Sequence, residues 1–582
     1  MKKYLALVLS LSVMLTAGCA NRQETQNSLP TDPTAVQLDE TMFTERDRKE
    51  EYDPQTAIQI ELKGDTAISN ANSVRIDGNT VTITEDGTYL LTGALAQGSI
   101  IVDAGDRAKP QLVLQGVDVT SEAAALEIRG ADKVFVTLAE GTENTLSGGT
   151  GDAVDGTVFS KQDLTFNGSG SLAVISNEGH GIVCKDDLVF TGGSYQIQSA
   201  SHGLDVNDSV RITDHTSLTM HTGKDGIHCE NGEDPEKGFV YMEKGSLNIT
   251  AEGDGLSAGA YVRILDGSVV VLAGGGHENG TKEHSDFFGG FMGGGRPQRP
   301  RQTQTTTSED STSMKGLKAD GEITIAGGSF VIDTADDCIH SNGNIAISGG
   351  SFDLSSGDDA IHADESLTLK ANINIKTSYE GLEAHKVYVQ GGDMEIHAKD
   401  DGINASGGQD SSGTEGGRDG MFGGWGGGRP GGPFGGGSSD GVIDISGGQL
   451  KIYSSGDGMD ANGSITISNG DLYVTNPSSG DTSVLDSDNG ATITGGTFIS
   501  AGASTMMAQS FAADSTQGVI ACTVGNQAAG TPVSVQDAQG NTLVSYETEY
   551  ACVLVIISTP ELQKGESYTL TVGNHSGPIQ AS

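Results

Sequence analysis

An acidic phrase that recurs about every 22 residues carries the groups of this sequence best suited to chemistry. An acidic and a small residue precede an aliphatic one, and the acidic position advances by 359 − 337 = 22, 380 − 359 = 21 and 401 − 380 = 21 residues. Stacked repeats would place like charges about 4.8 Å apart, which is unfavourable unless a cation lies between them. Calcium suits such a stripe because it takes several oxygen ligands from carboxylates and carbonyls. The expected calcium ligands are Asp336, Asp337, Asp358, Asp359, Glu380, Asp400 and Asp401.

The same acidic residues also have a purely structural interpretation. Asp at a tight corner hydrogen-bonds its own backbone, and a solvated corner residue needs no ion. Paired Asp-Asp on three of four successive repeats favours the metal site. His340 and His362 would form a short ladder beside the stripe, which we interpret as a surface stack and not as a ligand set.

Short strands and glycine corners must position these acids. Gly-Gly-Ser-Phe at 327–330 and at 349–352 opens a run with the alternating period of a strand, and no part of the repeat holds a helical period. Glycine permits the backbone angles of a tight corner. The repeat therefore predicts an all-β fold, a parallel β-helix of about 22 residues per coil with an aliphatic ladder as its core. A β-roll or irregular β-sandwich is the alternative, but the even spacing lacks its two-residue hairpin turns.

Two glycine-rich inserts interrupt the repeats, at about 274–313 and 406–439. They cannot form a core, because glycine and polar residues bury too little apolar surface to offset the cost of ordering. Their rings would stack on sugar faces and their arginines would attract uronate carboxylates; disordered spacers are the alternative interpretation. The expected carbohydrate-binding residues are Phe287, Phe288, Phe291, Phe422, Trp425 and Phe434.

The cysteines do not predict a metal site. Cys184 and Cys229 occupy equivalent positions two coils apart, a separation of roughly 9.6 Å that exceeds the reach of a disulfide. They are expected to be buried thiols. Cys522 and Cys552 lie in the segment after the repeats, where they either pair across strands or remain free.

The first residues have the form of a targeting segment. Lys2 and Lys3 precede an apolar run that ends in Thr16-Ala17-Gly18-Cys19 and resembles a bacterial lipoprotein signal, with Cys19 as the lipidated residue. Thr16 stands where an aliphatic residue is usual, and a plain secretory signal is the alternative. No other apolar run approaches 18 residues, so we expect membrane attachment through the N-terminal lipid only, at the cell surface.

These patterns predict the domain organisation. It comprises a signal peptide at 1–18, a disordered tether at 19–55, an N-terminal cap with the first coils at 56–145, the β-helix at 146–500 and a C-terminal β cap at 501–582.

The charge balance bears on the partners. The formal net charge is −45, with 78 acidic against 33 basic residues, which argues against nucleic acid or an anionic membrane surface. Such a surface suits divalent cations, although acidity also keeps an exported β-protein soluble. The chain is expected to act as a monomer.

Several phrases carry a family resemblance. They are TVTITEDGTYLLTG at 80–93, QLVLQGVDVT at 111–120, LAEGTEN at 138–144 and SKQDLTFNGSGSL at 160–172. With the later coils and inserts they resemble the clostridial carbohydrate-binding β-helix family over residues 56–575. The resemblance implies a right-handed parallel β-helix similar to that of pectate lyases, calcium bound along the coils, and binding to cellulose and acidic plant polysaccharides without a demonstrated catalytic role.

A surface-anchored carbohydrate-binding protein is therefore the expected function, with no catalytic residues. A β-helix lyase would need Arg or Lys as base on the acidic stripe, and Lys399 is the nearest basic neighbour in sequence. A hydrolase acting on uronate polymers would need two carboxylates across the scissile bond, which 78 acidic residues do not exclude. A general cell-surface adhesin is a third alternative with the same features.

Overall fold

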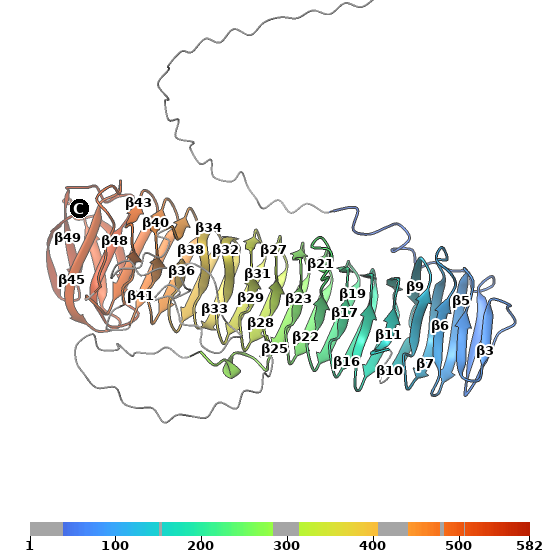
Figure 1. Cartoon of the computed structure of the whole chain (residues 1–582). Helices are drawn as coiled ribbons and strands as arrows, with labels where there is room; N and C mark the ends of the chain where they lie inside the picture. Colours follow the sequence, from blue (N-terminus) through green and yellow to red (C-terminus); the bar gives the residue numbers. More distant parts are fainter. Residues whose placement is uncertain (1–38, 150–153, 283–312, 406–439, 478–481, 506) are drawn as a thin grey trace, which may run out of the picture.

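The protein is an elongated stack of short strands, seen in a computed structural model that describes residues 39–149, 154–282, 313–405, 440–477, 482–505 and 507–582 (Figure 1). Most strands pair in parallel with the strand three places further along the chain, so that the coils form three ladders. Equivalent residues pair at the predicted spacing: Ile339 lies opposite Ile361, which lies opposite Leu382. The expectation of an all-β solenoid with a long, mostly parallel sheet is confirmed.

The first ladder carries the runs that follow the glycine corners. It contains β1 (Ile58–Gly64), β5 (Thr88–Leu95), β7 (Gln111–Thr120), β10 (Glu143–Gly148), β13 (Ser171–Ser176), β16 (Gly193–Ser199), β19 (Thr216–Thr222), β22 (Ser246–Ala251), β25 (Ser268–Ala273), β28 (Ser329–Thr334), β31 (Ser351–Ser356), β33 (Asn372–Ser378), β35 (Asp393–Ala398), β38 (Gln449–Ser454), β41 (Asp471–Asn476) and β44 (Thr497–Gly502).

The second ladder begins where the acidic phrase ends. It contains β4 (Thr80–Ile83), β6 (Ser99–Asp103), β8 (Leu126–Gly130), β11 (Gly156–Ser160), β14 (His180–Cys184), β17 (Leu204–Val206), β20 (Ile227–Cys229), β23 (Leu256–Ala258), β26 (Leu317–Ala319), β29 (Ile339–Ser341), the first parts of β32 (Ile361–Lys370) and β34 (Leu382–Gly391), β36 (Ile403–Ala405), β39 (Met459–Ala461) and β42 (Asp486–Ser487).

The third ladder closes each coil. It contains β9 (Lys133–Leu138), β12 (Asp163–Gly168), β15 (Asp187–Phe190), β18 (Ser209–Ile212), β21 (Phe239–Met242), β24 (Tyr261–Ile264), β27 (Glu322–Ile325), β30 (Asn344–Ile347), the second parts of β32 and β34, β37 (Val442–Ile445), β40 (Ser464–Ile467) and β43 (Ala491–Ile493). One continuous core of aliphatic and aromatic side chains fills the space between the ladders.

Antiparallel strands lie at both ends of the stack. At the N-terminal end β2 (Ala67–Ile68) pairs with β1, and β3 (Val74–Asp77) pairs with β4. At the other end β48 (Cys552–Ser558) pairs with both β44 and β45 (Val519–Gln527). A separate four-stranded sheet follows, made of β46 (Pro532–Gln536), β47 (Thr542–Glu547), β49 (Ser567–Val572) and β50 (His575–Gln580).

Residues 39–55 lie against the coils, contrary to the expectation of a disordered tether as far as residue 55. Asp47 is buried, and its carboxylate lies 2.8 Å from Lys133 Nζ and accepts a hydrogen bond of 2.7 Å from Thr165 Oγ1. Polar side chains on the outer face of the third ladder therefore hold this segment in place, a pairing that no local sequence pattern indicates. The rest of the tether and the signal peptide, with Cys19, lie outside the described residues.

Helical structure is confined, in the described part, to the single turn η1 (His277–Asn279). Within those residues no helix reaches the length and apolarity needed to cross a bilayer.

The cysteine positions agree with the register. Cys184 pairs in register with Val206, and Val206 with Cys229, so the two cysteines lie two coils apart as predicted, buried and unpaired. Cys522 and Cys552 are also free thiols here, although both side chains pack in the same small apolar cluster near β48.

The second glycine of each Gly-Gly corner supplies a backbone conformation that other residues resist. Gly392 has φ +95°, and a Cβ there would overlap the carbonyl oxygen of Ala371. We expect Gly392→Ala to lower the free energy of unfolding by about 1–3 kcal/mol or more, because strained φ and a steric clash add. Gly391→Ala is the matched control, since its Cβ would find Lys370 Cγ at 3.4 Å and no positive φ is required. Chemical denaturation of both variants checks this, and equal stability would contradict it.

Candidate functional site

The register aligns the acidic phrases at the corner that leads into the second ladder. At this corner, the backbone amide that follows each acidic position donates a hydrogen bond to the carbonyl of the equivalent acidic position in the next coil; the Cys338 amide, for example, donates to the Asp359 carbonyl. Equivalent residues of successive coils are therefore stacked. We call the stacked residues the corner column: His202, Asp225, Asp254, Lys315, Asp337, Asp359, Glu380, Asp401 and Asp457. Three residues further along lies the strand column: Asp205, His228, Ser257, Lys318, His340, His362, Glu383, Asn404, Asp460 and Asp486. Together the two columns form the corner stripe.

The corner carboxylates have a structural role. The sequence analysis considered that they bond their own backbone, but in the structure they accept hydrogen bonds from the backbone of the next coil. Asp337 Oδ1 accepts a hydrogen bond of 3.0 Å from the backbone amide of Asp359, and Asp359 Oδ1 accepts one of 3.3 Å from the amide of Glu380. Asp225 Oδ1 does the same for Asp254 at 2.8 Å. Each carboxylate thus holds the backbone of the next coil with one oxygen, which leaves the other oxygen for a different partner.

A buried lysine supplies that partner in the middle of the stripe. Lys315 is 4% exposed, and its Nζ lies 3.1 Å from Asp336 Oδ1 and 2.5 Å from Asp337 Oδ2. His340 Nδ1 lies 2.8 Å from the same Asp337 oxygen. Burial alone would raise the pKa of Asp337, but Lys315 and His340 hold it well below its usual range. This part of the stripe is therefore charge-compensated by the protein's own cations.

Lys315 corrects two interpretations of the sequence. The stripe does contain a basic residue, and the stacked acids at this level do not depend on a bound ion for compensation. Lys315-Gly316-Leu317 occupies the same position in its coil as Asp337-Cys338-Ile339 in the next, so the repeat could have revealed it. The signal was missed because the preceding insert separates it from its neighbours.

The two histidines of the predicted ladder are buried and not a surface stack. His340 and His362 pack with ring centroids 4.9 Å apart. His362 Nδ1 lies 2.7 Å from Glu383 Oε2, and its Nε2 lies 3.1 Å from Asp364 Oδ1. Burial would lower the pKa of His362, but its bonds to Asp359, Asp364 and Glu383 raise it well above its usual value.

Towards the C-terminal end of the corner stripe, several carboxylates lie close together and no lysine or histidine in the described part of the chain compensates their charge. Burial, followed by the charge of neighbouring carboxylates, raises the pKa of Asp457 to about 8 and that of Asp460 to about 7. Oxygens of Asp457, Asp460 and Asp486 lie within 4.8 Å of one another, and among the described residues none of the three forms an ion pair. Asn404 precedes Asp460 in the column, and its buried Oδ1 has no hydrogen-bond partner. This all-oxygen arrangement fits a hard cation.

The predicted metal ligands therefore divide into separate groups. Asp336, Asp337 and Asp358 converge within 4.8 Å, whereas Asp359 joins His362 and Glu383. Glu380, Asp400 and Asp401 belong to none of the groups of three that the described residues form. The group at Asp457 was missed, although its Asp-Gly-Met phrase repeats the same pattern.

A second acidic feature lies near the N-terminal end, at the corner before the third ladder. It is a cleft of about 540 Å³. Its lining includes Asp163, Asp186, Asp187, Asp208, Arg211 and Lys237. Arg211 lies 2.8 Å from Asp187, and burial together with a hydrogen bond to Asp208 raises the pKa of Asp186 to about 7. A carboxyl group that holds its proton near neutral pH is a candidate general acid.

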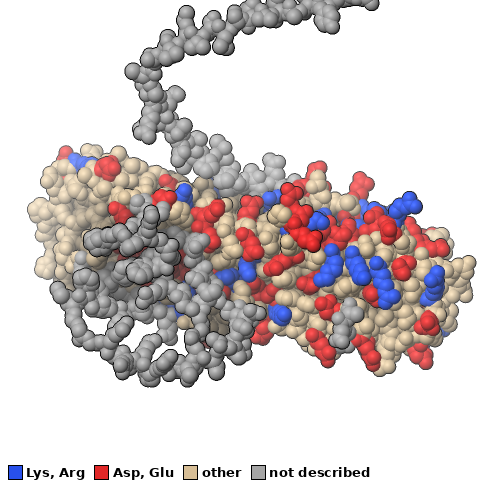
Figure 2. All heavy atoms as spheres, viewed as in Figure 1, with Lys and Arg blue, Asp and Glu red and all other residues tan. Residues whose placement is uncertain are grey.

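Acidic and basic side chains intersperse along this face of the coils, whereas the end formed by β45–β50 presents mostly uncharged residues (Figure 2). Near that end lies a groove of about 210 Å³, and its lining includes Tyr453, Tyr473, Tyr546 and residues 547–549. Tyr473 is 43% exposed, and Tyr550 beside the groove is 41% exposed. Tyr453 stacks on His397 with centroids 4.5 Å apart and meets Tyr550 edge to face at 6.2 Å.

The sequence analysis missed this groove and assigned carbohydrate binding to the inserts instead. Phe287, Phe288, Phe291, Phe422, Trp425 and Phe434 all lie outside the described residues, so their role stays a prediction. Tyr453 and Tyr473 occupy neighbouring strands with alternating outward positions, which the strand period shows. Their meeting with Tyr550 depends on how the last strands fold back, which no local pattern indicates.

Known proteins are similar to part of this chain. A family model described as carbohydrate-binding domain-containing protein matches residues 77–360. A protein of the same description from Acetivibrio thermocellus is 33% identical over 215 residues, which is 35% of this chain and 75% of that protein. A solved structure, the polysaccharide lyase-like protein from C. thermocellum as a gadolinium derivative, is 31% identical and covers 38% of this chain and 92% of its own, with a TM-score of 0.36.

Proposed function

The chain belongs to the carbohydrate-binding domain-containing family, and from this premise we propose that it binds plant cell-wall polysaccharide, cellulose or polygalacturonate, without catalysing its cleavage. The observation that carries the proposal is the tyrosine groove. Tyr473 lines the groove and is exposed, and the exposed Tyr550 lies edge to face against Tyr453 of the same lining; aromatic faces are suited to the apolar faces of sugar rings. A groove of about 210 Å³ is smaller than the roughly 300–1,000 Å³ of an enclosed small-molecule pocket, which suits contact with part of a longer polymer.

Calcium is the cofactor we propose. The oxygen-only group at Asp457, Asp460 and Asp486 and the unpartnered Oδ1 of Asn404 fit its preference for oxygen ligands. A protein of net charge −45 would also repel an anionic polymer such as polygalacturonate. Bound calcium would reduce that repulsion, which supports a role in ligand binding as well as in stability.

The finer architecture and the location belong to the same proposal. We expect the coils to wind right-handed, because parallel crossover connections are right-handed in about 98% of cases. The antiparallel strands at the two ends would act as caps that protect the open sheet edges. Lipidation at Cys19 would anchor the protein at the cell surface.

A second candidate function rests on the aspartate cleft. Asp186, with its pKa raised to about 7, and neighbouring Asp208 resemble the acid and carboxylate pair of a hydrolase, and Arg211 is a basic group of the kind that a lyase uses. Arg211 is already paired with Asp187, which favours a binding role for this cleft. Release of reducing ends, or of unsaturated uronate product, from polygalacturonate would establish an enzyme.

Removing the exposed rings is expected to weaken polysaccharide binding. Each ring contributes roughly 1–2 kcal/mol through buried area, so Tyr473→Ala combined with Tyr550→Ala should weaken binding by at least about tenfold. Pull-down on insoluble cellulose and titration with polygalacturonate, both in calcium, measure this.

Val331→Ala is the matched control, because Val331 is an exposed apolar residue of the first ladder on distant coils. Unchanged binding by the double tyrosine variant, with a normal melting temperature, would assign the ligand to the inserts or to the aspartate cleft.

A further inference from the structure

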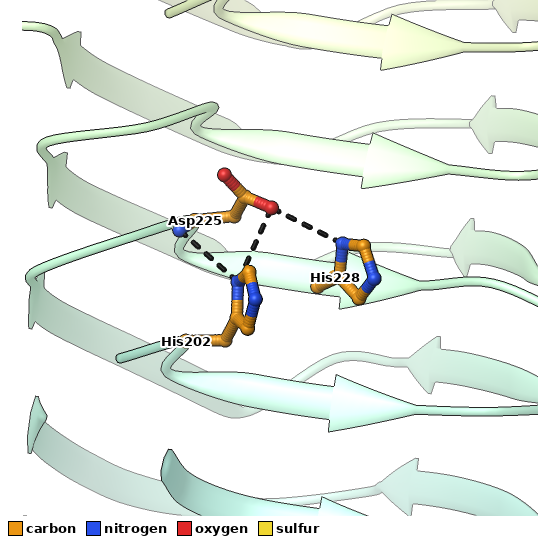
Figure 3. Close-up of side chains that lie close together, drawn as sticks. All are labelled: His202, Asp225 and His228. Carbon is orange, nitrogen blue, oxygen red and sulfur yellow. Dashed lines mark hydrogen bonds and ion pairs between the residues drawn. The ribbon is translucent and has the colours of Figure 1, made fainter. Parts of the chain in front are cut away.

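Two histidines and one aspartate converge near the N-terminal part of the corner stripe (Figure 3). His202 and Asp225 are neighbours in the corner column, and His228 follows Asp225 by three residues in the strand column. Asp225 Oδ2 lies 3.2 Å from His202 Nδ1 and 3.1 Å from His228 Nδ1. Two imidazole nitrogens thus face one carboxylate oxygen.

The surrounding structure fixes the orientation of all three groups. Asp225 Oδ1 accepts the backbone amide of Asp254 at 2.8 Å, which directs Oδ2 towards the two imidazoles. The His202 ring stacks against His228 with centroids 4.5 Å apart and against His180 at 5.1 Å. The ligand atoms are therefore held in place before any ion arrives, as a preorganised site requires.

One contact of His202 Nδ1 is not explained by hydrogen bonding, because it joins two acceptor atoms. His202 Nδ1 accepts the backbone amide of Asp225 at 3.2 Å, so in this tautomer the ring proton is on Nε2 and Nδ1 carries a lone pair. The same nitrogen faces Asp225 Oδ2, which is also an acceptor. A metal ion bound to Nδ1 and Oδ2 would replace this acceptor–acceptor contact and would take over the lone pair that the amide uses here; a proton on Nδ1 is the alternative.

We propose that His202, Asp225 and His228 form a binding site for a divalent transition metal of the zinc type. Zinc binds histidine nitrogen at about 2.0–2.1 Å and carboxylate oxygen at about 2.0–2.2 Å, so tetrahedral ligands lie about 3.3 Å apart. The separations of 3.2 and 3.1 Å match that edge length. The three side chains are partly exposed, which leaves the fourth position open to water.

The ligand chemistry separates this site from the calcium groups proposed further along the stripe. Imidazole nitrogen suits zinc, copper or nickel, whereas calcium prefers oxygen alone. Two imidazoles meet at His202 and His228, whereas Asp457 and Asp460 offer oxygen alone. His362, in the group with Asp359 and Glu383, already bonds carboxylates through both ring nitrogens. This inference does not depend on carbohydrate binding.

Zinc titration of the full-length protein in excess calcium tests the site, because calcium occupies the oxygen-only groups and leaves the imidazoles free. We expect one tight equivalent of Zn²⁺ by isothermal calorimetry. His202→Ala and His228→Ala should each weaken it by roughly 100-fold or more, since loss of a direct ligand exceeds the 10- to 100-fold effect of outer partners. His221→Ala is the matched control, because His221 is an exposed histidine of β19 outside the site.

Cobalt gives a second readout that does not depend on affinity. Co²⁺ bound by two imidazoles and a carboxylate in tetrahedral geometry should show visible d–d absorption, and Asp225→Asn should change that spectrum while the fold, checked by circular dichroism, is retained. Equal Zn²⁺ stoichiometry and affinity in the parent and the histidine variants would overturn the proposal. Absence of a tight equivalent in the parent would do so too, and would assign a proton to the position between the two histidines and Asp225.

Discussion

Replacing Lys315 by methionine is expected to lower the free energy of unfolding by about 3–5 kcal/mol, the usual cost of removing one partner from a buried ion pair. Lys315 contacts the carboxylates of Asp336 and Asp337, and Asp337 is fully buried. Methionine fills a similar volume but leaves His340 as the remaining close side-chain partner of Asp337. Urea denaturation followed by circular dichroism measures the loss, and hydrogen exchange at β26 and β29 locates it.

Lys318→Met is the matched control for this experiment. Lys318 belongs to the adjacent strand column, its side chain is 26% exposed, and its ion pair with Asp254 is 3.7 Å long. Its replacement should lower the free energy of unfolding by less than Lys315→Met does, because the ion pair is longer and its lysine reaches solvent, whereas both partners of the Lys315–Asp337 pair are buried. Similar losses in the two variants would show that Lys315 stabilises the stripe through packing and not through charge.

The same pair predicts a pH dependence with a definite sign. Asp337 has a folded pKa below its unfolded value, so its pairing stabilises the protein above about pH 4 and that contribution is lost as the pH falls through the folded pKa. The acid side of the stability profile should therefore be shallower in Lys315→Met than in the parent. Free energies of unfolding measured across this acidic range test the expectation.

Calcium is expected to raise the melting temperature, and the rise should grow with pH. Asp457 and Asp460 have folded pKa values of about 8 and about 7, above the value of about 4 for an unfolded aspartate. The folded state binds their protons more tightly, so in chelator its stability should fall as the pH rises across this interval. Calcium takes the place of these protons and adds about 2.7 kcal/mol at a concentration 100 times its Kd.

Replacing both aspartates by asparagine should change the melting temperature in opposite directions without and with calcium. In chelator, Asp457→Asn with Asp460→Asn should melt above the parent at pH 8, because repulsion between buried carboxylates is removed. In saturating calcium the same variant should melt below the parent. Asp471→Asn, an exposed aspartate of β41, is the control and should follow the parent under both conditions. A parent melting curve that calcium leaves unchanged at every pH would contradict the proposal.

The repeat made the strands and their register predictable, because each coil buries the same alternating positions. The spacing from Ile339 to Ile361, the glycine corners and the separation of Cys184 from Cys229 all agree with the structure. Contacts made outside the repeat were not predictable. Asp47 reaches Lys133 across the outer face of the third ladder, and no periodic pattern encodes such a meeting.

The position of the corner stripe could be predicted from the sequence, but which of its carboxylates are compensated by basic side chains could not. Stacking of the acidic phrases placed the corner stripe correctly, since the register alone decides it. Whether a carboxylate's charge is compensated depends on its contact with Lys315, His340 or His362. Lys315 directly follows an insert, so its place in the repeat is hard to recognise in the linear sequence. The tyrosine groove depends on how the last strands fold back on the coils, which the repeat does not determine.

The corner carboxylates point consistently towards the C-terminal end of the stack. Asp225 holds the backbone of Asp254, and Asp337 holds that of Asp359, so in these contacts the earlier coil supplies the side-chain acceptor. A chain that emerges with its N-terminus first thus presents, on each coil that carries such an aspartate, a side-chain acceptor before the next coil arrives. Growth in the opposite direction would find, among the described residues, only the backbone carbonyls of the later coil at this corner. These side-chain bonds favour the addition of coils in the order of the sequence.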